Sequence, residues 1–357
     1  MKKKMLYMSH VDWNWIKQRP QFLAEGLMEY FDVSILYAYQ NRNRAVLQKR
    51  DCSKLDLTAI RSIPLAGRVA PLRAINRVWQ RKQFAKQIRR VQPDYLYLTY
   101  PNQVELIPQG YDGTVIYDCM DDHVAMTLES VKKRMEDQER RLFERADVIL
   151  ISSETLRQHH LKRYGAQYEP KLHLIRNGYS GDILDTVQSP VQPKQDFLLT
   201  YVGTIGKWFN MDYVERSVRD IPGLRYRIIG PSELELPQSD QIEFPGTVEH
   251  DRLYEAVQDA DAMIMPFVLN DIVRAVDPVK LYEYINYNKN ILCVEYDEVQ
   301  RFEPYVFFYQ DYESYLAQIR GMMEHPAVKY SQQQRLEFLE QNNWSSRVRS
   351  IVEALGE

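Results

Sequence analysis

FLLTYVGTIGKW, residues 197–208, is an apolar run of strand length that ends at two glycines, Gly203 and Gly206. An apolar run that stops at a glycine turn predicts a buried β-strand. A helical pattern follows at residues 212–219, which gives the strand–turn–helix order of a unit with a parallel sheet. Glycines at such a turn let the backbone approach a phosphate closely, and Lys207 adds a positive charge. The same turn is also typical of an ordinary strand–helix connection.

The alternation of strands and helices extends in both directions along the chain. Further predicted strands are residues 225–230, 262–267 and 290–295 on the C-terminal side, and residues 5–8, 33–38, 95–100, 114–118 and 148–152 on the N-terminal side. Helical patterns lie between them, for example at residues 20–30 and 128–145. This order predicts an α/β protein with two Rossmann-like parallel sheets. Ligands bind outside the carboxyl ends of such strands, so we expect the site in a cleft between two domains.

A polar stretch that contains prolines, residues 177–195, interrupts the alternation and predicts a linker. It separates an N-terminal domain, residues 1–176, from a C-terminal domain, residues 196–330. Residues 331–357 are expected to form a C-terminal helix that packs back on the N-terminal domain.

The composition is that of a globular protein, with 45% hydrophobic and 27% charged residues in a chain of 357. A net charge of -3 gives no general attraction to nucleic acid. Three cysteines, far apart in sequence, indicate neither a disulfide framework nor a zinc site. The start, MKKKMLYMSH, is too short in its apolar part for a signal peptide, and no stretch approaches the ~20 apolar residues of a membrane span. We therefore expect a cytoplasmic protein.

Basic residues gather in one part of the chain. No acidic residue occurs between Leu57 and Pro93, whereas this stretch contains Arg61, Arg68, Arg73, Arg77, Arg81, Lys82, Lys86, Arg89 and Arg90. Such a block predicts an anionic partner, either a membrane surface or an acceptor molecule. The alternative is a solvated basic helix that packs on its own domain.

AVDPVKLYEY, residues 275–284, begins a second candidate phosphate site. The Asp-Pro pair 277–278 suits the N-cap and first position of a helix, so the N–H groups of Val279 and Lys280 would face an anion. Glu283 is on the same face and can accept hydrogen bonds from a vicinal diol such as a ribose. The pair matches the polar parts of a nucleoside diphosphate, although a surface ion pair explains it equally well.

Taken together, these motifs resemble the donor domain of GT-B glycosyltransferases, especially the family 4-like bacterial enzymes of cell-surface polysaccharide synthesis. The features that carry the resemblance are YVGTIGKWFNMD (201–212), RIIGP (227–231), FPGTV (244–248), DADAMIMPF (259–267) and PVKLYEY (278–284). VDWNWIKQRPQFLAEGL (11–27) and YDCMDDH (117–123) resemble the N-terminal half of the same enzymes. Within them, the teichuronic acid biosynthesis glycosyltransferases are most similar, and xanthan-type glucuronosyltransferases are more distant.

The resemblance implies a role for each matching residue of the donor site. Lys280 would bind the donor diphosphate and Glu283 the ribose. Gly203 and Thr204 would line the phosphate path, and the loop at Gly230 would face the base. One departure is Ala275, where family 4 enzymes often have a glutamate, which weakens any transfer of their retaining mechanism. The neighbouring Arg274 would recognise an anionic donor sugar such as glucuronate.

YDCMDDH follows a predicted strand, so its carboxylates are candidates for the base that takes a proton from the acceptor hydroxyl. Asp121 and Asp122 remain equivalent at this point, with His123 as an orienting partner or a rival base. The alternative is a helix cap with acidic residues in the first turn.

Residues after the first predicted strand are candidates for the acceptor site. His10 and Trp13 would bond to and stack on an acceptor sugar, and Arg19 would meet an anionic group. Burial of the tryptophan in the core is the alternative.

These observations predict a glycosyltransferase that moves a sugar, with glucuronate preferred, from a UDP-sugar to a lipid-linked polysaccharide acceptor. The UDP-sugar is a substrate, and we expect neither a cofactor nor a metal, because the resemblance to GT-B enzymes implies none and the histidines do not cluster with cysteines or carboxylates at zinc spacing. Attachment to the inner face of the plasma membrane through residues 61–90 is a further expectation. A nucleotide-sugar 2-epimerase and a catalytically silent scaffold of a membrane polysaccharide synthase remain as alternatives.

Overall fold

The computed structural model describes residues 2–15, 17–39, 52–64, 66, 70–179, 181–184, 196–249 and 252–357. The chain divides into two units. The first unit comprises Met1–Gly178 and Trp344–Glu357, and the second comprises Tyr179–Asn343. Most of the predicted linker, residues 185–195, lies outside the described residues.

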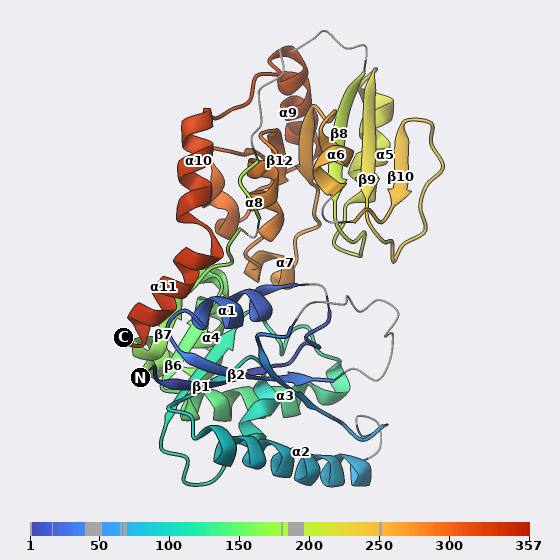
Figure 1. The fold of residues 1–357 in the computed structure, drawn as a ribbon. Helices are drawn as coiled ribbons and strands as arrows, with labels where there is room; N and C mark the ends of the chain where they lie inside the picture. Colours follow the sequence, from blue (N-terminus) through green and yellow to red (C-terminus); the bar gives the residue numbers. More distant parts are fainter. Residues whose placement is uncertain are drawn as a thin grey trace. The chain divides into compact units, whose positions relative to one another are not determined.

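The first unit is built on a parallel sheet of seven strands in the order β3-β2-β1-β4-β5-β6-β7. The strands are β1 (Lys4–Ser9), β2 (Asp32–Ala38), β3 (Asp56–Ile60), β4 (Tyr95–Leu98), β5 (Thr114–Cys119), β6 (Val148–Ile151) and β7 (Leu172–Leu174). The helices are α1 (Arg19–Leu27), α2 (Ala70–Val91), α3 (Glu129–Arg145) and α4 (Glu154–Tyr164), with 3-10 helices η2 (Pro101–Leu106) and η3 (Ala166–Lys171). Figure 1 shows α1 on one face of this sheet and α2 and α3 on the other.

The second unit is built on a parallel sheet of six strands in the order β10-β9-β8-β11-β12-β13. The strands are β8 (Phe197–Val202), β9 (Leu224–Ile229), β10 (Ile242–Gly246), β11 (Ala262–Met265), β12 (Asn290–Val294) and β13 (Phe307–Tyr309). The helices are α5 (Met211–Asp220), α6 (Leu253–Val257), α7 (Asp271–Ala275), α8 (Val279–Asn286) and α9 (Tyr312–Glu324), with the 3-10 helix η5 (Asp297–Phe302). Two Rossmann-like sheets are what the sequence predicts.

The C-terminal segment differs from the single predicted helix. It forms two helices, α10 (Gln332–Gln341) and α11 (Trp344–Ala354), and α10 belongs to the second unit. Asn342 ends α10, and its side-chain amide donates to the carbonyl of Phe338. Only α11 therefore packs on the first unit, because its apolar face fits the core there.

The packing of α11 against α1 depends on one glycine. The rings of Phe22 and Trp344 stack with centroids 5.2 Å apart. A Cβ atom at Gly26 would lie 2.6 Å from a Val348 methyl group, a distance that real side chains do not adopt. Gly26 thus lets the two helices approach closely, and the contact joins the C-terminal helix to the core of the first unit.

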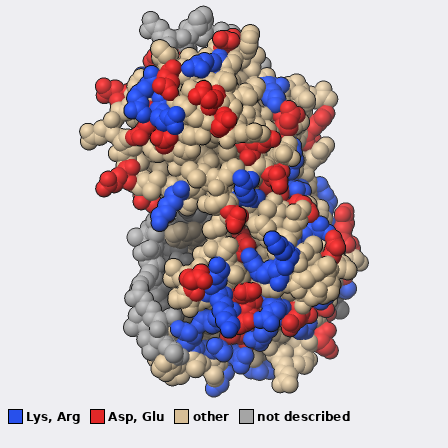
Figure 2. Space-filling view, turned by 180° about the vertical axis from the view of Figure 1, so that it is seen from behind, with Lys and Arg blue, Asp and Glu red and all other residues tan. Residues whose placement is uncertain are grey.

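No helix in the described part of the chain is both long enough and apolar enough to cross a membrane. Figure 2 shows Lys and Arg side chains gathered on the part of the first unit where α2 lies in Figure 1. The described residues of the basic block are therefore exposed or half-buried.

Candidate functional site

Two strand ends and one helix meet in the second unit. Gly203 follows β8 and has a φ of +146°, and an ideal Cβ there would lie 2.3 Å from Lys280 Cε and 2.8 Å from Nζ. Gly230 follows β9, and a Cβ there would lie 2.1 Å from the Gly203 carbonyl oxygen. The side chain of Lys280 on α8 therefore packs directly on the glycine turn after β8. This is the arrangement that the sequence predicts for a phosphate site.

Lys280 is a half-buried cation near the carboxylate of Glu283. Burial lowers its pKa, and the carboxylate of Glu283 raises it only in part. Its Nζ lies 5.8 Å from the centroid of the Tyr201 ring, but it forms no hydrogen bond or ion pair with any residue that the structure describes. Since desolvating a charge is costly without a partner, the site is electrostatically complementary to a bound anion.

Two tyrosines that the sequence did not single out hold this arrangement. The Tyr284 hydroxyl on α8 accepts from the Val202 N–H at 3.0 Å and donates to the Val202 carbonyl at 3.3 Å. The Tyr201 hydroxyl donates to the carbonyl of Thr204 at 3.0 Å, which fixes the glycine turn. Tyrosines in an apolar strand and helix look like core residues, so only the structure reveals this role.

The predicted cap of α8 is wrong. Pro278, not Asp277, is the N-cap residue, and it makes no side-chain capping bond. The Asp277 carboxylate instead pairs with Arg301 and accepts a hydrogen bond from the Tyr282 hydroxyl at 3.2 Å. This pair, in which the carboxylate is fully buried and the guanidinium is half-buried, anchors the start of α8 to η5.

The other predicted donor residues differ in how exposed they are to solvent. Thr204 and Val279 are half-buried at the glycine turn and at the start of α8, and Glu283 is half-buried one turn after Lys280. Lys207 and Arg274 are exposed, with Arg274 in the last turn of α7. Their part in donor binding stays a prediction.

Gly203→Ala is expected to lower both stability and the affinity for a nucleoside diphosphate. The new Cβ would displace Lys280 and would force a non-glycine residue to a positive φ, which costs roughly 1–3 kcal/mol. Thermal unfolding and titration with UDP measure the two effects. Gly321→Ala on α9 is the matched control, because its Cβ would meet no atom within 4 Å. Equal behaviour of the two variants would contradict this description of the turn.

In the first unit, the structure separates the two candidate bases. Asp121 follows β5 and is half-buried, and its carboxylate has no hydrogen bond to any residue in the described ranges. Burial raises the pKa of Asp121 to about 6, helped by the neighbouring carboxylates of Asp118 and Asp122 and opposed by Arg19. A carboxylate with a pKa near neutrality suits a general base.

Asp122 is held in an ion pair, which contradicts its prediction as a base. Arg163 donates to its two oxygens at 2.8 and 2.6 Å, and the N–H of Ala125 donates at 3.0 Å. Burial raises the pKa of Asp122, but these bonds outweigh it, so the pKa is lowered. The carboxylate acts as a local cap, which was the alternative reading of this motif.

His123 and His10 form an aromatic group with Tyr100. The His123 ring centroid lies 4.7 Å from that of Tyr100 and 5.8 Å from that of His10. Burial lowers the pKa of both histidines, that of His10 to about 3, so both are neutral at pH 7. His10 therefore remains available for an acceptor hydroxyl, as a hydrogen-bonding group without charge.

The other two acceptor predictions are wrong. Trp13 is fully buried in the core of the first unit, where it cannot stack on a ligand. Arg19 is also buried and donates to Asp118 at 2.8 to 3.1 Å, as well as to the carbonyl of Ile175 at 2.8 Å. Its charge is used to join α1, β5 and the end of β7.

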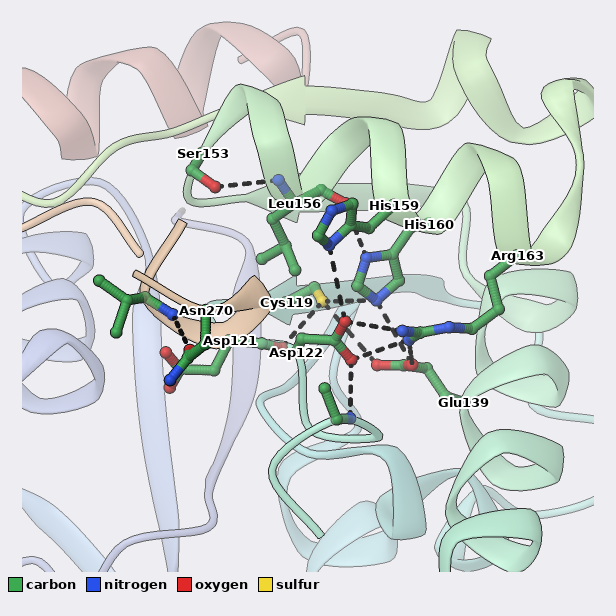
Figure 3. Close-up of polar contacts among 12 residues, drawn as sticks. Cys119, Asp121, Asp122, Glu139, Ser153, Leu156, His159, His160, Arg163 and Asn270 are labelled. Atoms are coloured by element: carbon green, nitrogen blue, oxygen red, sulfur yellow. Dashed lines mark hydrogen bonds and ion pairs between the residues drawn. The ribbon is translucent and has the colours of Figure 1, made fainter. Parts of the chain in front are cut away.

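A buried polar cluster lies beneath the Asp121 loop (Figure 3). His160 Nε2 is 3.3 Å from a Glu139 oxygen and 3.5 Å from Cys119 Sγ, and its Nδ1 donates to the Leu156 carbonyl at 2.8 Å. Hydroxyl groups of Tyr117 and Tyr164 donate to Glu139 at 2.7 Å each. Burial would lower the pKa of His160, but Cys119 and Glu139 outweigh it and hold the pKa well above its usual range.

The fold brings one histidine close to a cysteine and a carboxylate, although their spacing in the sequence is not that of a zinc site. Their three donor atoms lie within 4.8 Å of one another. The hydrogen bonds and the ion pair satisfy these groups without a further ligand, so we interpret the cluster as support for the loop that carries Asp121. None of the His160 surface is exposed, whereas the side chain of the neighbouring His159 is 34% exposed.

Comparisons with known proteins identify the fold of the chain. No family model matches the chain. The structure superposes on the apo form of the lipopolysaccharide outer core galactosyltransferase WaaB with a TM-score of 0.71, covering 99% of both chains at 11% identity. It superposes on HepE from Anabaena, solved with UDP and glucose, with a TM-score of 0.69 over 99% of this chain and 100% of that one, at 12% identity. The chain has the GT-B fold.

One curated relative adds a sequence match to the GT-B fold. TuaH of Bacillus subtilis (strain 168), whose assignment as a teichuronic acid biosynthesis glycosyltransferase is itself provisional, is 22% identical over 285 residues. The match covers 73% of this chain and 71% of the relative. The GT-B fold also occurs in a UDP-N-acetylglucosamine 2-epimerase, with a TM-score of 0.54, 13% identity and coverage of 99% and 96%. The fold by itself therefore does not decide the activity.

Proposed function

We propose that the protein is a glycosyltransferase that moves a sugar from a UDP-sugar to a saccharide acceptor. The observation that carries the proposal is Lys280, a half-buried cation that packs on Gly203 and forms no hydrogen bond or ion pair with a described residue. A diphosphate leaving group gains negative charge during transfer, and a fixed cation in a partly desolvated site stabilises that charge. The match to TuaH and the UDP complex of HepE support this choice.

The remaining donor contacts follow from the residues around Lys280. Glu283 accepts hydrogen bonds from the ribose hydroxyls. Arg274 pairs with the carboxylate of the donor sugar, which we propose to be glucuronate. The reaction needs no cofactor, and Lys280 supplies the positive charge that a metal supplies in other transferases.

In the first unit, Asp121 acts as the base that takes the proton of the acceptor hydroxyl. Its raised pKa, about 6, leaves the carboxylate ionised at pH 7 while keeping it a stronger base than an exposed aspartate. Transfer requires that an acceptor bound by the first unit reaches the anomeric carbon of a donor bound by the second.

Product analysis separates this proposal from its alternatives. The protein is incubated with UDP-glucuronate, UDP-glucose or UDP-N-acetylglucosamine, with and without a saccharide acceptor. A transferase releases UDP rapidly only when an acceptor is present, and the sugar of the donor is then found linked to the acceptor. A changed sugar without acceptor identifies an epimerase instead. Absence of any turnover, with UDP bound, favours the silent scaffold.

We further propose that the acceptor is lipid-linked and that α2 attaches the protein to the inner face of the membrane. Ile75, Val78 and Trp79 in the first half of α2 are 57%, 52% and 39% exposed, whereas Phe84 in the second half is fully buried. After these apolar residues, the second half of α2 carries exposed basic residues, which are Arg81, Lys82, Lys86, Arg89 and Arg90. Apolar and basic side chains on one exposed helix are typical of contact with anionic lipid. Arg68, also in this basic block, lies outside the described residues.

Replacing Lys82, Lys86 and Arg89 by Gln is expected to weaken binding to phosphatidylglycerol vesicles. Each charge contributes ~1 kcal/mol near an anionic surface, so the three together give a loss of about 100-fold. Vesicle flotation measures the effect, with phosphatidylcholine vesicles as the control for charge. Unchanged flotation of the triple variant would contradict the attachment.

A further inference from the structure

The second glycine of the turn after β8 leaves room for a tryptophan ring. An ideal Cβ at Gly206 would lie 2.5, 2.6 and 2.7 Å from the Cη2, Cζ3 and Cζ2 atoms of Trp208. Real side chains do not approach so closely, so the six-membered ring of the indole occupies the space that a side chain at Gly206 would need. Trp208 itself is half-buried. At this glycine the turn therefore presents an aromatic surface rather than bare backbone.

The indole of Trp208 is connected to the part of the turn that contacts Lys280. Burial raises the pKa of Tyr201, and the side chain of Trp208, which donates a hydrogen bond to the Tyr201 hydroxyl, opposes this rise. That hydroxyl and Lys280 Nζ lie 2.9 and 2.8 Å from the position that a Cβ at Gly203 would take. The N–H group of the indole and the ammonium group of Lys280 therefore lie in one small region.

The segment that carries Trp208 is joined to the loop after β11. The N–H of Val268 donates to the Trp208 carbonyl at 2.7 Å, and Phe209 forms an isolated antiparallel bridge with Phe267. β8 and β11 are neighbours in the sheet, so the two connected segments leave it side by side. Val268 is 46% exposed. A half-buried tryptophan and an exposed valine thus give an apolar surface at the carboxyl ends of β8 and β11.

Glu283 lies one turn further along α8 than Lys280 and has different neighbours. Burial raises the pKa of Tyr179 and that of Tyr287, and the carboxylate of Glu283 raises both further. Tyr287 is the C-cap residue of α8, whereas Lys280 lies in the first turn of the helix. The carboxylate is therefore directed toward the C-terminal end of α8, away from the turn that Lys280 contacts.

The order of groups in a UDP-sugar matches this order of residues. The diphosphate lies between the ribose and the sugar. With the ribose at Glu283 and the diphosphate at Lys280, the sugar extends past Lys280 on the side of Trp208. Arg274, which we propose to pair with a carboxylate of that sugar, lies on α7, the helix that follows the loop carrying Val268.

We propose that the ring of the donor sugar packs on the indole of Trp208, and that this contact makes the protein bind a UDP-sugar more tightly than UDP. A sugar ring has a face of C–H groups, which packs on an aromatic ring while the hydroxyl groups stay in contact with water. The contacts of the indole with Gly206 and Tyr201 fix its orientation, which lowers the entropic cost of binding. The inference rests on the proposed function, because it assumes that the diphosphate binds at Lys280.

Calorimetric titration compares UDP with UDP-glucose, UDP-N-acetylglucosamine and UDP-glucuronate. We expect at least one UDP-sugar to bind the unmodified protein more tightly than UDP. Trp208→Leu should weaken the binding of that UDP-sugar roughly fivefold, as for the loss of one aromatic contact, and leave the affinity for UDP within about twofold. Trp208→Phe keeps an aromatic face and should retain most of the preference. Tyr30→Leu, which removes a 38% exposed ring from the first unit, is the control and should change neither affinity.

Three outcomes would overturn the sugar contact. An equal loss of affinity for UDP and for the UDP-sugar in Trp208→Leu would show that Trp208 only holds the turn. An unchanged preference in this variant, or the absence of any preference in the unmodified protein, would show that the sugar does not reach the indole. Failure of the unmodified protein to bind UDP or any UDP-sugar is a different result, because it overturns the donor site at Lys280. Normal UDP binding by Trp208→Leu shows that the donor site of the variant is folded.

Tryptophan fluorescence tests the contact in the unmodified protein. The UDP-sugar should change the emission more than UDP does, because a sugar packed on the indole changes the surroundings of Trp208. Trp208→Phe retains the other tryptophans and should lack this additional change. An additional change of equal size in Trp208→Phe would contradict the proposal.

Discussion

Asp121→Asn is expected to lower kcat by roughly 10²–10⁴-fold, the usual contribution of a general base. The amide keeps the size of the side chain but cannot accept the proton of the acceptor hydroxyl. Since the pKa of Asp121 is raised to about 6, the kcat/KM of the unmodified protein should fall as the pH drops through 6. The variant should lose this acidic limb.

The same substitution should raise stability, which distinguishes a loss of chemistry from a loss of structure. The pKa of Asp121 is higher in the folded protein than in the unfolded chain, so protonation stabilises the fold, and this stabilisation is lost as the pH rises through 6. At pH 7 the ionised, half-buried carboxylate opposes folding. Asn at this position removes that cost, and the melting temperature should increase.

Asp122→Asn is the matched control for Asp121→Asn. It breaks the ion pair with Arg163, so it should lower the melting temperature and leave the acidic limb of the pH profile in place. An Asp121→Asn protein that retains normal kcat, or that retains the limb near pH 6, would show that another group takes the proton.

Asp118→Ala is expected to reduce the free energy of unfolding of the first unit by about 3–5 kcal/mol, because it leaves the charge of Arg19 buried without a partner. The Arg19 side chain and that of Asp118 are 4% and 0% exposed, so solvent cannot replace the lost carboxylate. Chemical denaturation measures the change.

Two further variants test the reason for this loss. Glu129→Ala breaks an ion pair with Lys132 in which the side chains are 89% and 43% exposed, so it should cost less than about 1 kcal/mol. The double variant Arg19→Met/Asp118→Leu should recover part of the loss, because it removes both buried charges. A Asp118→Ala protein as stable as Glu129→Ala would mean that the buried pair does not hold α1 and β5 together.

The strands that sequence patterns missed share one physical property. They are β3, β7, β10 and β13, which are the edge strands of the two sheets. Central strands of a parallel sheet are covered on both faces and therefore appear as continuous apolar runs. An edge strand is covered less, and β10, for example, alternates between exposed residues and buried or half-buried ones. Apolar runs alone could not reveal β3, β7 or β10, whereas β13 lies in the short apolar run at residues 305–309.

In the candidate site, contacts between local motifs could be predicted from the sequence, whereas contacts set by the tertiary fold could not. The contact of Lys280 with Gly203 was predictable because each residue lies in a local motif at the end of a strand or the start of a helix. The roles of Trp13 and Arg19 were not predictable. The sequence does not show that Trp13 packs in the core or that Arg19 pairs with Asp118. Arg73 and Arg134 line one cavity only through the topology of the first unit, and no short pattern connects them.

The central claim is that Lys280 binds the diphosphate of a UDP-sugar, and calorimetric titration with UDP tests it most directly. UDP, GDP and the UDP-sugars are titrated into the unmodified protein, Lys280→Ala and the control Lys162→Ala, which removes an exposed lysine from the first unit. We predict that UDP binds in preference to GDP and that Lys280→Ala weakens this binding roughly tenfold or more, while the control does not. UDP binding that is equally tight in the Lys280→Ala protein would contradict the account.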